Sequence, residues 1–129
     1  RLGGLLGMEA ADIITTLEPC LGPEDLPAIQ ASVRSVHASP ALVDYIQALV
    51  EHTRRSPDYI TGLSPRAALA LLNCARAWAL LEGRDKVLPE DVQSVLPGVA
   101  GHRLRPVHDG VRRSGMDTAE NLISAVPVP

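Results

Sequence analysis

The run from Ala67 to Leu81 contains only two polar residues, Asn73 and Arg76, and it most constrains the fold of this chain. The other residues are mainly Ala and Leu, which favour helix over strand. A helix that is apolar around most of its circumference is stable in water only when other elements cover it. We therefore predict an all-α bundle of five to six helices, with this helix covered on most sides.

Clear signals mark both ends of this central helix. Ser64 is a natural N-cap, because its hydroxyl can accept from backbone N–H groups in the first turn. Pro65 suits the first helical position, where its missing N–H costs nothing. Gly83 is a typical C-cap. The sequence thus predicts a helix that begins at Pro65 and ends near Gly83.

Ser-Pro and Pro-acid steps recur at the predicted starts of several other helices and separate them from one another. Within the amphipathic helix that opens at Ser39-Pro40, Glu51 and Arg55 have the favourable i, i+4 order. We also expect a short extended segment near Val36–Ala38. One expected helix starts at Gly22-Pro23 and carries an apolar stripe of Leu26, Ile29 and Val33. The others cover residues 9–17, 40–55, 89–99 and 118–126.

Composition excludes several classes of function. Hydrophobic residues make up 46% of the 129 residues without a stretch as long as a membrane span, which predicts a soluble globular protein. A formal net charge of −3 and only three aromatic residues argue against general nucleic-acid binding and base stacking. Cys20 and Cys74 are too few for a disulfide scaffold. We expect both to be reduced, buried residues of a cytosolic protein.

No catalytic or metal-binding constellation is evident. The four histidines (His37, His52, His102 and His108) lack metal-ligand spacing with one another or with Cys and carboxylates. The chain has no glycine-rich phosphate loop ending in Gly-Lys-Ser/Thr, and its one lysine, Lys86, follows no glycine. We therefore expect no catalytic residue, no metal ligand and no nucleotide hydrolysis by such a loop within this chain.

Arg66 is the strongest candidate for binding. A cation in the first turn lies at the positive end of the helix dipole, which is mildly unfavourable. Together, a guanidinium and a helix N-terminus favour an anion such as phosphate. At 100° per residue, Arg66, Asn73 and Arg84 fall on one narrow polar seam. The alternative is a simply solvated Arg66; His102-Arg103 is a weaker candidate, alternatively a solvated helix end.

Four motifs follow one another along the chain: Gly62-Leu63-Ser64-Pro65-Arg66-Ala67-Ala68-Leu69, Leu80…Gly83-Arg84-Asp85, Val87-Leu88-Pro89-Glu90-Asp91-Val92 and His102-Arg103-Leu104. In this order they resemble the C-terminal helical lid of MoxR-type AAA+ ATPases. The resemblance covers about residues 20–106 and includes an upstream pattern from Val36 to Arg54. Leu88 stands where that family often has a Thr or Ser cap. The lid of magnesium-chelatase-type AAA+ subunits is similar and stays an alternative.

The resemblance implies a role for Arg66 as the sensor 2 residue, which reaches from the lid to the γ-phosphate of ATP held by a neighbouring α/β core. It implies ATP and Mg in the full-length protein, with none bound to this fragment. The partners implied are the core of the same chain, neighbouring subunits of a hexameric ring and client proteins, in the cytoplasm. Such ATPases remodel or mature partner protein complexes.

The expected organisation follows from this resemblance. The chain begins at Arg1 without Met, so we expect a fragment in which residues 1–8 are a mobile lead-in from the missing core. Residues 9–106 form the lid, and residues 107–129 form a tail with a short helix at 118–126.

Two other functions remain open at this point. One is a stand-alone helical module that binds a partner protein and has no nucleotide role. The other is a helical DNA-binding domain, which needs a basic recognition helix, whereas the best-defined helices here are neutral or acidic.

Overall fold

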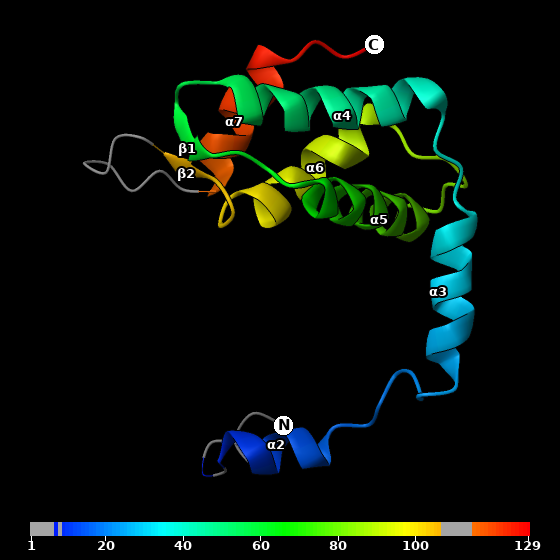
Figure 1. The fold of residues 1–129 in the computed structure, drawn as a ribbon. Coiled ribbons are helices and arrows are strands. Elements are labelled where there is room, and N and C mark those ends of the chain that lie inside the picture. Colours follow the sequence, from blue (N-terminus) through cyan, green and yellow to red (C-terminus); the bar gives the residue numbers. More distant parts are fainter. Residues whose placement is uncertain (1–6, 8, 107–114) are drawn as a thin grey trace. The chain divides into compact units, whose positions relative to one another are not determined.

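The computed structural model describes residue 7, residues 9–106 and residues 115–129, and it forms two compact units, Arg1–Gln30 and Ala31–Pro129 (Figure 1). Of the expected lead-in at 1–8, all but Gly7 lies outside the described residues. The stretch 107–114 of the expected tail also lies outside them.

The first unit contains α2 (Ala10–Thr16) and the beginning of α3 (Asp25–Ser35). The carboxylate of Asp25 accepts a hydrogen bond of 2.8 Å from the backbone N–H of Gly22, which fixes the start of α3. Neither helix has a buried residue, so the apolar stripe of α3, which includes Leu26 and Ile29, is exposed.

The second unit holds the remaining helices and confirms the predicted all-α bundle. Its hydrophobic core is built from Leu, Val, Ile, Ala and the buried ring of Tyr45. The helices α5 and α6 pack together, and α7 packs on α6 and α4. The elements are α4 (Pro40–Arg55), β1 (Tyr59–Thr61), α5 (Pro65–Leu81), α6 (Pro89–Ala100), β2 (Arg105–Pro106) and α7 (Gly115–Ala125).

A short antiparallel strand pair, which the sequence did not predict, joins β1 to β2 (Figure 1). Tyr59 pairs with Pro106 and Thr61 pairs with Arg105. The pair fixes the segment that leads into α5 beside the segment that follows α6. Near the predicted extended segment, His37 forms an isolated parallel bridge with Lys86.

The prediction that α5 is covered on most sides was wrong. Its buried residues are Ala67, Leu71, Ala75 and Ala79, which lie along one side of the helix. Leu69, Trp78 and Leu81 are 63%, 40% and 83% exposed. The cause is that α5 packs mainly against α6 and α4, which cover the side with its buried residues.

The predicted polar seam also needs correction. The helix ends at Leu81, and Gly83 adopts a φ of 76°, a left-handed conformation that favours glycine at this position. Arg84 therefore lies beyond the helix, where it pairs with Asp91. Only Arg66 and Asn73 remain as exposed polar residues of the seam on α5.

The expectation of buried cysteines was wrong as well, because Cys20 and Cys74 are both exposed. Cys20 belongs to the first unit, where neither helix has a buried residue. Cys74 lies on α5 but is not among its buried residues.

Candidate functional site

The candidate site is the corner where the chain enters α5. The hydroxyl of Ser64 accepts a hydrogen bond of 3.2 Å from the backbone N–H of Ala67, which confirms the predicted N-cap. Pro65 occupies the start of the helix, as its fixed φ favours. Leu63, directly before the cap, is buried in the core and anchors the corner.

Thr53 holds this corner against the end of α4. Its buried hydroxyl donates to the carbonyl of Val50 at 2.7 Å and accepts from the backbone N–H of Leu63 at 2.9 Å. Helical spacing places Thr53 on the inward face of α4 but does not identify this contact with Leu63. A buried hydroxyl on an otherwise apolar stripe was the available signal.

Gly62 allows the close approach of the loop to α4. A Cβ atom at this position would lie 2.7 Å from the Cα of Arg54 and 2.9 Å from its backbone nitrogen. These are backbone atoms, so a larger residue would force the two segments apart. Gly62 and Thr53 together fix the position at which α5 begins.

Arg66 lies in the first turn of α5 with an exposed side chain. Among the described residues, the ion pairs are Arg55–Glu51 and Arg84–Asp91, and neither includes Arg66. Its guanidinium therefore has no carboxylate partner in this part of the chain, while the helix start behind it is firmly held. An anion that approaches this turn meets a free cation and the positive end of a helix dipole.

Arg84, the other arginine of the predicted seam, has a structural role. Its Nη1 and Nη2 atoms donate to the two carboxylate oxygens of Asp91 at 2.5 Å each. The carboxylate, only 1% exposed, also accepts from the backbone N–H of Leu88 at 2.7 Å. Since Leu88 has no capping side chain, Asp91 supplies the acceptor at the start of α6.

This pair shifts the pKa of both partners. The hydrogen bonds from Arg84 hold the pKa of the Asp91 carboxyl below its usual value, against the effect of burial, and the bond from Leu88 adds to this. The same hydrogen bonds raise the pKa of Arg84. The position of Asp91 in the first turn of α6 is a local feature of the sequence, whereas its pairing with Arg84 depends on the tertiary fold.

The weaker candidate residues, His102-Arg103 and the other histidines, do not come together in a site among the described residues. His102 and Arg103 are exposed in the turn after α6, where the backbone N–H of Arg103 donates to the carbonyl of Ala100. His37 is exposed, His52 is half-buried, and His108 lies outside the described residues. Within the described ranges, no group of three His, Cys, Asp or Glu side chains is placed to hold a metal ion. None of the described helices combines the length and hydrophobicity that a bilayer span requires.

Comparison with known proteins identifies the family to which this chain is similar. The AAA lid domain family matches residues 51–123. A Bacillus subtilis protein, YeaC, is 36% identical over 94% of this chain and 38% of its own length. Chaperone MoxR1 of Mycobacterium tuberculosis is 37% identical over 70% of this chain and 26% of its own length. The chain thus spans only about a third of these relatives.

A crystal structure of a Cytophaga hutchinsonii protein has the same fold, with a TM-score of 0.72 and 28% identity over 82% of this chain and 36% of the other. The magnesium-chelatase subunit ChlI of Nicotiana tabacum is 50% identical, but over only 31% of this chain and 9% of its own length. The fold, the motif that presents Arg66 and these matches agree: the chain belongs to the AAA lid domain family, as a lid of the MoxR type.

Proposed function

We propose that this chain is the lid of a MoxR-like AAA+ ATPase, in which Arg66 contacts the terminal phosphate of ATP held by an α/β core of the same protein. The observation that supports this role most strongly is the exposed Arg66 guanidinium, which has no ion-pair partner among the described residues. The corner that presents it is held by the Ser64 cap and by the Thr53–Leu63 hydrogen bond.

The chemistry of Arg66 fits a triphosphate. Its planar guanidinium can donate two parallel hydrogen bonds to phosphate oxygens, and it keeps its charge at any physiological pH. Bound Mg²⁺ neutralises phosphate charge during transfer, and in this proposal its ligands come from the core. The Ser64 cap and the Thr53–Leu63 hydrogen bond hold the corner that carries Arg66. Loss of the terminal phosphate would therefore release the whole lid from the nucleotide, so that hydrolysis would move the lid relative to the core.

The wider role is proposed from the relatives. One of them is a chaperone, MoxR1, and we propose that the ATP cycle of the whole protein remodels or matures partner protein complexes. The proposed assembly is a hexameric ring in the cytoplasm, in which lid and core alternate and nucleic acid has no part.

ATP turnover of the protein that joins this lid to its core tests the proposal. Arg66→Ala should reduce turnover by about tenfold or more, because one contact to the transferred phosphate is lost. The matched control is Arg55→Ala, since Arg55 is also exposed and its ion pair among the described residues is with Glu51 on its own helix. Circular dichroism should show the same helix content in both variants. Unchanged ATP turnover in the Arg66→Ala variant would refute the proposed contact between Arg66 and the terminal phosphate.

A stand-alone interaction module is the second candidate, favoured by the uncovered apolar side chains of α5. In that case Arg66→Ala would leave nucleotide turnover unchanged, whereas Leu81→Glu would weaken capture of a partner protein. The two functions therefore give opposite results with the same pair of variants.

A further inference from the structure

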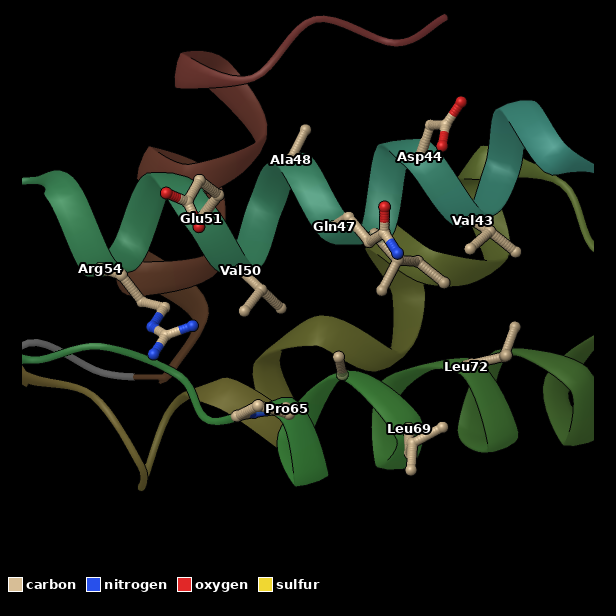
Figure 2. Close-up of a pocket in the computed structure, with 12 residues that line it drawn as sticks. Val43, Asp44, Gln47, Ala48, Val50, Glu51, Arg54, Pro65, Leu69 and Leu72 are labelled. Atoms are coloured by element: carbon tan, nitrogen blue, oxygen red, sulfur yellow. The ribbon is translucent and has the colours of Figure 1, made fainter.

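A groove of about 760 Å³ lies between α4 and α5 (Figure 2). Its apolar lining includes Ile46 and Val50 from α4 and Ala68 and Leu72 from α5. Figure 2 shows Val50 pointing from α4 toward α5. The proposed contact of Arg66 with nucleotide does not use this groove, since Arg66 does not line it.

The length of the groove matches a short helix. On α4 its lining runs from Val43 to Arg54, which at 1.5 Å per residue corresponds to about 16 Å, or three helical turns. Leu69 on the α5 side is 63% exposed, so the groove offers an apolar contact that no described residue fully covers. A helix that lies along such a groove inserts apolar side chains from one stripe.

The charges along the groove restrict the occupant further. Asp44 and Glu51 both line the groove, are exposed and lie seven residues apart, on the same face of α4. The Oε1 atom of Glu51 forms an ion pair with the Nε atom of Arg55 at 2.6 Å, whereas Asp44 has no ion pair in the described residues. Arg54 lies at the end of the groove near Pro65, where it would favour an acid (Figure 2).

We propose that this groove binds an amphipathic helix of a partner protein, with one apolar stripe and two basic residues seven positions apart beside it. The apolar stripe fills the space between α4 and α5, and the two basic residues face Asp44 and Glu51. Pro65 lines the groove and directly precedes Arg66, so the bound helix touches the turn that presents Arg66. The proposal does not depend on the nucleotide role.

Two synthetic peptides test the charge preference with the intact 129-residue chain. Each is a labelled peptide of about fourteen residues with Leu along one helical stripe. One carries Lys at two positions seven apart beside the stripe, and the other carries Glu there. Fluorescence anisotropy at low salt should show about tenfold tighter binding of the Lys peptide, and 1 M salt should reduce the difference. No binding of the Lys peptide, or equal binding of the two, would overturn the proposal.

Two variants of α5 locate the binding. Leu69→Glu should weaken binding of the Lys peptide by about tenfold, because it places a charge on the apolar lining. Leu81→Glu is the matched control, since Leu81 is even more exposed and does not line the groove. Both residues are exposed, so circular dichroism should show the wild-type fold. Asp44→Lys should reverse the preference between the peptides. Equal weakening by Leu81→Glu would place binding elsewhere and refute the groove.

Discussion

Replacing Asp91 with alanine removes the carboxylate that connects the end of α5 to the start of α6. That carboxylate accepts two hydrogen bonds from Arg84 and one from the backbone N–H of Leu88. It is almost completely buried, whereas the Arg84 side chain is 30% exposed. Solvent therefore screens the ion pair in part, and the lost contacts cannot be replaced by water on the buried side.

These contacts allow an estimate of the loss. A net hydrogen bond to a charged group is worth about 1.5–3 kcal/mol, and breaking a fully buried pair costs about 3–5 kcal/mol. With the screening at Arg84, we expect Asp91→Ala to lower the free energy of unfolding by about 2–4 kcal/mol. For a unit of this size, Tm should fall by roughly 10–20 °C. Asp91→Asn keeps an acceptor for Leu88 and should lose less.

Urea and thermal unfolding, followed by circular dichroism at 222 nm, measure this effect. Glu90→Ala is the control, because Glu90 is the exposed acid next to Asp91 in the first turn of α6; it should stay within about 1 kcal/mol of wild type. A Tm of Asp91→Ala within about 2 °C of wild type would refute the reasoning.

The same pair predicts how stability depends on pH. Because the folded pKa of Asp91 is lowered from 3.8, the unfolded chain binds more protons as pH falls through this region. The contribution is thus fully present above 3.8 and is lost as pH falls below it toward the folded pKa. The stability difference between wild type and Asp91→Asn should be constant from about pH 5 to 8 and shrink below about pH 4.

Two further predictions concern the corner before α5. Gly62→Ala should destabilise the fold by about 1–3 kcal/mol in urea unfolding, because its Cβ would meet the backbone of Arg54. Gly98→Ala, within α6 and without neighbours inside 4 Å, should instead stabilise it by about 0.5–1 kcal/mol; equal signs for the two would contradict the argument. Thr53→Val should cost about 1–3 kcal/mol, since the buried N–H of Leu63 loses its acceptor; wild-type stability would show that another acceptor replaces it.

Local signals were sufficient to predict most of the helices. The Ser-Pro steps at Ser39 and Ser64 cap α4 and α5 in the structure as the sequence indicated, because capping depends on residues within one turn. The pair Glu51–Arg55 follows from helical spacing and is present at 2.6 Å. Such contacts require no knowledge of the tertiary fold.

Contacts between distant segments could not be predicted in this way. The β1–β2 pair depends on how α6 returns the chain to Thr61, and neither strand has a distinct sequence pattern. The extent of burial of α5 depends on which elements are available to cover it, so an apolar sequence overstated it. The partner of Arg84 could not be predicted either, because the turn after α5 decides that Arg84 reaches Asp91.

The candidate site also has one part that the sequence predicts and another that only the tertiary fold reveals. Helix capping predicted the position of Arg66 in the first turn of α5. The support from Thr53 and Gly62 depends on the packing of the loop against α4, which the sequence alone does not reveal. The proposed role of Arg66 came from a family resemblance, and it stays a prediction.

Nucleotide selectivity of the protein that joins this lid to its core tests the central claim most directly. If Arg66 contacts the terminal phosphate, Arg66→Ala should weaken binding of a non-hydrolysable ATP analogue by about tenfold, as measured by isothermal titration calorimetry. Binding of ADP, which lacks that phosphate, should change by less than about twofold. Equal weakening of both nucleotides, or of neither, would contradict the proposed contact between Arg66 and the terminal phosphate.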